Sequence, residues 1–206
     1  MPQSRRYKKK KSAGKAILAW IVVLAILAAA VFVFVSVFYE DTKKKLDEMN
    51  YPRTYSTYVE KAAKDYDLDP ALIYAVIHTE SGFDPKAESG VGAKGVMQMM
   101  PSSFEWLQEQ RGCAGQYTED DLFDPEICID YGSYLLKYFY DYYGTERSAI
   151  AAYNAGFVVS DWLSDTNYSS DGKNLDSIPY PETKNYVDKV ESAKEMYIKL
   201  YYSQSN

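Results

Sequence analysis

The feature that most constrains this chain is an uncharged apolar run of 24 residues near the N-terminus, Ala16–Tyr39. About 20 consecutive apolar residues are enough for a helix to cross the hydrocarbon core of a membrane. A cleaved signal peptide has a shorter apolar region, of about 7–15 residues, followed by small residues. Ala28-Ala29-Ala30 offers such a site, but the apolar run continues beyond it. We therefore expect an uncleaved transmembrane helix over residues 16–39, with cleavage near Ala30 as the alternative.

The charges before this run predict its orientation. Residues 1–39 contain no acid and seven cations, which are Arg5, Arg6, Lys8, Lys9, Lys10, Lys11 and Lys15. Flanking cations keep a segment in the cytoplasm. The sequence therefore predicts a single-pass protein of the cell membrane, with a basic cytoplasmic tail at 1–15 and the rest outside the cytoplasm. The mixed-charge residues 40–53 are interpreted as a stalk, and residues 54–206 as one globular domain.

The part of the chain beyond the apolar run is acidic. Removing the seven N-terminal cations from the 23 Lys and Arg leaves 16, against 29 Asp and Glu, so residues 40–206 carry a net charge of −13. Binding nucleic acid needs a basic face that neutralises phosphates. This balance argues against nucleic acid as a partner, and the basic tail is better interpreted as a topology signal.

Two cysteines, Cys113 and Cys128, and one histidine leave too few ligands for a structural zinc site. In an oxidising exterior the two cysteines could form a disulfide, which would close a short loop and contribute about 3 kcal/mol. Two reduced thiols are the alternative, and the sequence does not decide between them.

From Tyr55 onward the pattern is helical. Asp69-Pro70 and Asp124-Pro125 each place a capping aspartate before a proline at the first helical position, which is a strong helix start. We expect a mainly α domain, with a small hairpin near the glycine-bearing loop that follows Gly82. The expected helices cover 55–66, 70–82, a segment from Pro101, 125–144, 148–155, 157–163 and 181–202.

Glu80 is the first candidate for chemistry. It follows Val76 by four residues and Ile77 by three, so it lies at the end of the apolar stripe of its helix. It also lies in the last turn, where the helix dipole disfavours a negative charge. Both effects keep a carboxylic acid protonated near neutrality, as a general acid must be. From position alone, however, a solvated glutamate at a helix end is the commoner case.

Four sequence blocks around and after Glu80 change this interpretation. They resemble the catalytic domain of the soluble-lytic-transglycosylase type, a branch of the lysozyme superfamily, over about residues 54–200. One block departs from the family, since Val96 stands where leucine is usual. The blocks are Glu80-Ser81-Gly82-Phe83-Asp84-Pro85, Gly92-Ala93-Lys94-Gly95-Val96-Met97-Gln98-Met99-Met100-Pro101, Ala152-Tyr153-Asn154-Ala155-Gly156 and Tyr180-Pro181-Glu182-Thr183-Lys184-Asn185-Tyr186-Val187.

The resemblance implies a lysozyme-like helical fold with a glycan cleft, and peptidoglycan glycan strands as the partner. It implies a lytic transglycosylase that needs no cofactor and no metal, with Glu80 as catalytic acid and base. The residues that it places at the substrate are Ser89, Met97, Gln98, Met100, Tyr153, Asn154, Glu182 and Tyr186.

Other interpretations of these residues and of the activity stay open. The methionines are equally explained as core residues, Asn154 as a helix cap and Tyr186 as a packing residue. A hydrolase related to goose-type lysozyme and an inactive glycan-binding scaffold are the alternative functions. The sequence names neither protein partners nor the biological process.

Overall fold

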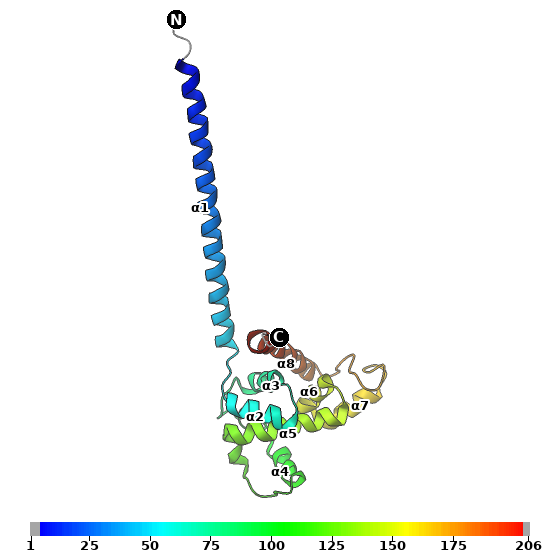
Figure 1. The fold of residues 1–206 in the computed structure, drawn as a ribbon. Coiled ribbons are helices and arrows are strands. Elements are labelled where there is room, and N and C mark those ends of the chain that lie inside the picture. Colours follow the sequence, from blue (N-terminus) through cyan, green and yellow to red (C-terminus); the bar gives the residue numbers. More distant parts are fainter. Residues whose placement is uncertain (1–4, 204–206) are drawn as a thin grey trace. The chain divides into compact units, whose positions relative to one another are not determined.

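The computed structural model describes residues 5–203, with side chains from residue 14 onward (Figure 1). The described chain forms a long N-terminal helix and a separate compact unit that begins at Tyr51.

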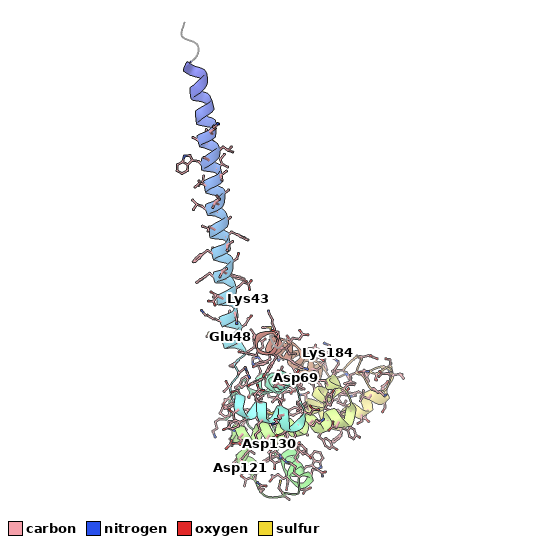
Figure 2. The ribbon with its side chains drawn as sticks, viewed as in Figure 1. Lys43, Glu48, Asp69, Asp121, Asp130 and Lys184 are labelled. Atoms are coloured by element: carbon pink, nitrogen blue, oxygen red, sulfur yellow. The ribbon has the colours of Figure 1, made fainter. Side chains whose placement is uncertain are left out.

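The N-terminal helix α1 spans Arg5–Asn50 without interruption. It is long and apolar enough to cross a membrane. Its apolar side chains project on all sides and are exposed (Figure 2). The predicted stalk is helical as far as Asn50. Ion pairs between residues four apart, such as Lys45–Asp41 at 2.7 Å, support this part of the helix. Residues 1–4 of the predicted basic tail lie outside the described residues.

The compact unit is built from helices, which confirms the mainly α prediction. The side chain of Asp69 accepts a hydrogen bond from the backbone N–H of Ala71, and Asp124 does the same for Glu126, so both predicted start signals are helix caps. The helices are α2 (Ser56–Tyr66), α3 (Pro70–Ser81), α4 (Pro101–Gln110), η1 (Glu119–Phe123), α5 (Pro125–Tyr143), α6 (Glu146–Ala155), η2 (Gly156–Val158), α7 (Val159–Ser164), α8 (Pro181–Tyr197) and the π-helical η3 (Ile198–Tyr202).

The structure differs from the predicted elements in three places. The expected hairpin is reduced to two isolated antiparallel bridges, Glu88–Lys94 and Lys94–Met99, and residues 5–203 contain no strand. The last predicted helix changes to π-helical geometry at Ile198. The 3₁₀ helix η1 was not predicted, although Thr118 and Asp121 form a capping box at its start.

Helices α3 and α8 pack against each other, and α2 and α6 pack against α5 (Figure 1). Seven consecutive residues of α3, from Ala71 to Ile77, are buried, so this helix is apolar all round, as a central helix must be. The rings of Tyr74 and Tyr197 stack with their centroids 5.1 Å apart, which joins α3 to the end of α8. The core therefore holds α3 against α8 along their lengths.

Lys194 fixes the same helices from their polar side. Its Nζ lies 3.2 Å from Asp69 Oδ2 and 2.7 Å from Glu146 Oε2. Asp69, labelled in Figure 2, caps α3, and Glu146 lies in the first turn of α6. One largely buried ammonium group on α8 thus ties down the starts of two other helices.

The two cysteines do not pair with each other. The Cys113 thiol lies 3.3 Å from the Tyr131 hydroxyl, whereas Cys128 is buried and accepts a hydrogen bond from the backbone N–H of Met97, at 3.4 Å. Of the two alternatives that the sequence left open, the structure therefore shows free thiols.

Candidate active site

Glu80 lies in the last turn of α3, at the end of the most buried helix. Its carboxyl group is partly buried, and the hydroxyl of Tyr186 donates a hydrogen bond of 2.7 Å to Glu80 Oε1. Tyr186 lies on α8 among buried residues. The packing of α3 against α8 thus brings together a carboxyl group and a phenol that are 106 positions apart in the sequence.

Burial raises the pKa of Glu80 from 4.5 to about 7, and the hydrogen bond from Tyr186 opposes this by stabilising the carboxylate. Desolvation is the larger of the two effects. A carboxyl group with this pKa holds a proton in a large part of the molecules at neutral pH and can also release it. Such a group can serve as a general acid and then as a general base.

A second phenol, that of Tyr153, lies close enough to Glu80 for the two groups to interact electrostatically. Burial raises the pKa of Tyr153 well above its usual value, and the charge of Glu80 raises it further. The Tyr153 hydroxyl donates a hydrogen bond of 2.9 Å to the backbone carbonyl of Met97. Tyr153 therefore stays neutral and ties α6 to the loop between α3 and α4.

A cavity of about 340 Å³ opens beside Glu80. It brings together four of the predicted site residues from three helices, and three residues that were not predicted. Its lining consists of Thr79, Glu80, Asn154, Glu182, Asn185, Tyr186 and Lys189. Asn154 Oδ1 accepts a hydrogen bond of 2.8 Å from Thr183, which leaves the amide NH₂ group of Asn154 available to a ligand. The lining thus offers amide, carboxyl, hydroxyl and ammonium groups, all of which can bind sugar hydroxyls.

The remaining predicted residues lie in or next to the loop of residues 82–100, hereafter the glycine loop. Ser89 Oγ accepts a hydrogen bond of 2.9 Å from the Ala93 N–H. Gln98, at φ 45°, donates from Nε2 to the carbonyls of Ala87 and Gly95, both at 3.0 Å. These polar side chains hold the loop together. Met100, at the N-cap of α4, is exposed.

Met97 differs from its predicted place on the cleft wall. Its side chain is fully buried against Gly132 of α5, where an added Cβ would lie 2.5 Å from the Met97 sulfur. Such a side chain has no accessible surface to offer a glycan. Its backbone carbonyl, which accepts from Tyr153, is the part of Met97 that bears on the site.

Gly95 determines how closely the glycine loop approaches the core. Its φ is +75°, and an added Cβ would lie 2.0 Å from the backbone carbonyl oxygen of Leu122. A larger residue would therefore push the loop away from η1. The loop carries Met97, so the position of the Tyr153 hydroxyl depends on this close approach.

Sequence reasoning missed Thr79, Asn185 and Lys189 in the cavity lining. Helical spacing was the available signal for two of them, because Asn185 and Lys189 follow Glu182 by three and seven residues and share the helix face that carries Tyr186. Thr79 precedes Glu80 directly. Within the described part of the chain, no group of three or more His, Cys, Asp or Glu side chains is placed to hold a metal ion.

Known proteins are similar to the compact unit in both sequence and fold. A family model described as "Transglycosylase SLT domain" matches residues 57–175. The soluble lytic murein transglycosylase of Escherichia coli K12 is 32% identical over 146 residues, which are 69% of this chain. The membrane-bound lytic murein transglycosylase C of Actinobacillus succinogenes is 30% identical over 167 residues, covering 70% of this chain and 47% of its own length.

Solved structures give the same result. The 70 kDa soluble lytic transglycosylase of E. coli superposes with a TM-score of 0.68 at 27% identity, over 76% of this chain and 26% of that one. The lytic transglycosylase Slt of Pseudomonas aeruginosa, solved as an inactive glutamate-to-glutamine mutant, gives 0.65 at 30% identity, over 74% and 25% of the two chains. This chain spans 23% of the curated E. coli enzyme. The match over more than half of its residues nevertheless shows that it belongs to the transglycosylase SLT domain family.

Proposed function

We propose that this chain is a peptidoglycan lytic transglycosylase that cleaves the β-1,4 bond between N-acetylmuramic acid and N-acetylglucosamine. The observation that carries the proposal is the partly buried carboxyl group of Glu80 at the wall of a polar cavity, where burial raises its pKa to about 7. The relatives named as lytic murein transglycosylases, soluble and membrane-bound, support it.

In the first step, Glu80 donates its proton to the glycosidic oxygen, and the bond to C1 of the muramic residue breaks. Tyr186 stabilises the resulting carboxylate through its hydrogen bond to Oε1. The acetamide of the substrate can stabilise the cationic sugar, as in substrate-assisted glycosidases. In this scheme Asn154 and Glu182 bind and orient the sugar from opposite helices, α6 and α8.

In the second step, the Glu80 carboxylate removes the proton from the C6 hydroxyl of the muramic residue. The C6 oxygen attacks C1 and closes a 1,6-anhydro ring. The proton returns to Glu80, and no water is consumed, so the reaction is a lyase reaction. One residue serves as acid and then as base, which is why a pKa near 7 suits it better than the ordinary value of 4.5.

One observation favours a hydrolase over a lyase, and it concerns Glu182. It is an exposed second carboxylate on the lining of the same cavity. A carboxylate there could activate a water molecule, which would make the enzyme a glycosidase that yields a reducing end. The 1,6-anhydro reaction is preferred because the named relatives are transglycosylases.

Product analysis tests the proposal. Peptidoglycan digested by the full-length chain in detergent is examined by mass spectrometry. Muropeptides with 1,6-anhydro ends support the lyase, reducing ends support the hydrolase, and the absence of new ends contradicts both and favours a binding scaffold.

We further propose that residues 16–39 span the cell membrane, with residues 1–15 in the cytoplasm, residues 40–53 as the connecting segment and the catalytic unit, residues 54–206, outside. The support is the apolar part of α1, preceded by seven cations, and the membrane-bound relative. Protease added to intact cells stripped of their wall is expected to remove the catalytic unit. Protection of that unit would contradict the orientation.

A further inference from the structure

Thr183 belongs to the last motif block but has no role in the mechanism above. It follows Glu182 on the first turn of α8, and its side chain is only 3% exposed. The described residues that line the cavity beside Glu80 include Glu182 but not Thr183. Thr183 therefore does not touch a bound sugar, and any effect that it has on the reaction must pass through a neighbouring residue.

That neighbour is Asn154, near the end of α6. Helices α6 and α8 pack against each other (Figure 1), and the Thr183 hydroxyl donates a hydrogen bond of 2.8 Å to Asn154 Oδ1. Within the described part of the chain, this is the one hydrogen bond that the Thr183 hydroxyl forms. Asn154 itself is exposed and lines the cavity. A buried hydroxyl on α8 is thus joined to a cavity residue on α6.

This hydrogen bond determines which side of the Asn154 amide is left for the cavity. The amide has an acceptor oxygen on one side and an NH₂ group with two donors on the other. If the amide were turned by half a rotation, its NH₂ group would donate to Thr183, and the buried hydroxyl proton of Thr183 would lose its acceptor. An unpaired buried donor makes the turned amide less populated by roughly 5- to 150-fold. The NH₂ group is therefore available to the cavity before any ligand arrives.

The orientation of this amide matters because other donors of the lining are engaged within the protein. The Thr79 hydroxyl donates to the carbonyl of Ala75 at 2.8 Å, and the Tyr186 hydroxyl donates to Glu80 Oε1 at 2.7 Å. A sugar hydroxyl can rotate to suit either side of an amide, whereas an acetamide carbonyl or an ether oxygen of a sugar can only accept. A turned Asn154 amide would place its own oxygen against such an atom and repel it.

We propose that Thr183 is a positioning residue, which holds the Asn154 amide so that its NH₂ group binds an acceptor oxygen of the sugar at Glu80. The inference rests on the proposed function, because it assigns the donor side of Asn154 to the sugar that is cleaved. An amide that is already oriented needs no reorganisation when the substrate binds, so both the bound state and the transition state are stabilised. Thr183 acts here on Asn154 and not on the proton of Glu80.

Two substitutions at Thr183 test this role in the full-length chain in detergent, with the release of anhydro products as the assay. Thr183→Val keeps the shape of the side chain and removes the hydroxyl, so we expect kcat/KM to fall by about three- to tenfold, as suits one neutral hydrogen bond. Thr183→Ser keeps the hydroxyl and is expected to stay within about twofold of the wild type. The alkaline limb of the pH profile is expected to stay in place in both variants, because the hydrogen bond from Tyr186 to Glu80 is untouched.

Ser148→Ala is the matched control for the loss of a buried hydroxyl. Ser148 is a fully buried residue of α6 whose hydroxyl donates to the carbonyl of Lys173 at 3.3 Å, away from the cavity lining. Both Ser148→Ala and Thr183→Val are expected to lower the midpoint of urea unfolding, because each removes a buried hydrogen bond. Only Thr183→Val is expected to lower kcat/KM.

A double-mutant cycle with Asn154→Ala shows whether Thr183 acts through Asn154. In the Asn154→Ala background, Thr183→Val is expected to cause no further loss of kcat/KM, because the amide that Thr183 orients is absent. The same cycle is measured on the affinity of the Glu80→Gln chain for purified glycan strands. The coupling between the two residues is then obtained even where turnover is too slow to measure.

Two results would overturn the inference while the proposed function stands. In one, a folded Thr183→Val chain retains the kcat/KM of the wild type. In the other, Thr183→Val lowers kcat/KM and glycan affinity by the same factor whether or not the Asn154 amide is present. If the wild-type chain releases no anhydro ends, the proposed function fails instead, and the inference about Thr183 fails with it.

Discussion

Two regions of the compact unit carry motif residues but use their polar groups in opposite ways. One is the wall that α3 and α8 form beside the catalytic cavity, hereafter the α3–α8 wall, with Glu80, Glu182 and Tyr186. The other is the glycine loop. On the wall, Glu80 accepts a hydrogen bond from the hydroxyl of Tyr186 and lines the cavity. In the loop, the side chains of Ser89 and Gln98 form hydrogen bonds with the backbone of the loop itself. The side chains of the wall are therefore available to act on a substrate, whereas the polar side chains of the loop stabilise the conformation of the loop.

This contrast separates two kinds of substitution. Changes on the wall are expected to alter turnover and its pH dependence while the fold persists. Changes in the glycine loop are expected to alter stability first, and turnover only through the folded fraction or through the position of Tyr153. Four variants test this division.

Glu80→Gln is expected to cause the largest loss. One general acid–base group typically contributes about 10²–10⁴-fold to the rate, and Glu80 serves both half-reactions, so we expect the upper end of that range or more. The amide keeps the shape of the side chain but has no proton to transfer. Anhydro-product release measured by mass spectrometry gives the rate. Near-normal turnover in a folded variant would move the catalytic role to another acid, with Glu182 as the first candidate.

The same variant has an expected effect on stability. Between pH 4.5 and about 7, the native state holds a proton on Glu80 that the unfolded state has lost, so stability falls as pH rises through that window. Glu80→Gln lacks this fall. We expect it to be more stable than the wild type above pH 7, by roughly 1–3 kcal/mol, since one pKa unit corresponds to about 1.4 kcal/mol. Urea unfolding at pH 5 and pH 8 measures the difference, which would be absent if Glu80 were a solvated glutamate.

Gly95→Ala is expected to cause the largest effect in the glycine loop. The new Cβ would meet the Leu122 carbonyl at 2.0 Å, at a φ of +75°. Overpacking and left-handed strain together predict a destabilisation of about 2–4 kcal/mol. Gly90→Ala is the matched control, because nothing lies within 4 Å of its added Cβ. Equal unfolding midpoints for the two variants would show that the loop does not depend on this close approach.

The wall and the loop also differ in how far the sequence predicted them. Local signals such as Asp69-Pro70 and Asp124-Pro125 gave the helix starts, because a cap is made by neighbouring residues. From position alone, a solvated glutamate was the favoured interpretation of Glu80, and the four motif blocks reversed it; the structure shows a partly buried carboxyl group with a raised pKa. The hydrogen bond from Tyr186 was not foreseeable from periodicity, since it spans 106 positions and depends on how α3 packs against α8.

Residue type alone was misleading where a side chain is used by the fold. Met97 belongs to a recognisable motif, but Gly132 on α5 leaves room for its sulfur in the core. Lys189 belongs to no motif, yet it lines the cavity beside Glu80 because it shares a helix face with Tyr186. Such assignments depend on tertiary packing, which a single sequence does not display.

Tyr186→Phe is expected to have an intermediate effect on the wall. A hydrogen bond to a charged group is worth about 1.5–3 kcal/mol, so turnover is expected to fall roughly 10- to 100-fold. The hydroxyl lowers the pKa of Glu80, so its removal raises that pKa further. The alkaline limb of the profile of kcat/KM against pH, which reports loss of the Glu80 proton, is therefore expected to move to higher pH. An unmoved limb would contradict a direct action of Tyr186 on Glu80.

Glu182→Gln is expected to have the smallest effect of the four, a loss of less than about tenfold. Glu182 is exposed on the first turn of α8, and its proposed role is to bind and orient the sugar, which a glutamine amide partly preserves. If Glu182 instead activated water, as in a hydrolase, its loss would cost the roughly 10²–10⁴-fold typical of a general base, and reducing ends would disappear from the products. The comparison with Glu80→Gln under identical conditions therefore separates a wall with one catalytic carboxyl group from a wall with two. A loss for Glu182→Gln that equals the loss for Glu80→Gln, with circular dichroism unchanged in both, would contradict the single-carboxyl mechanism.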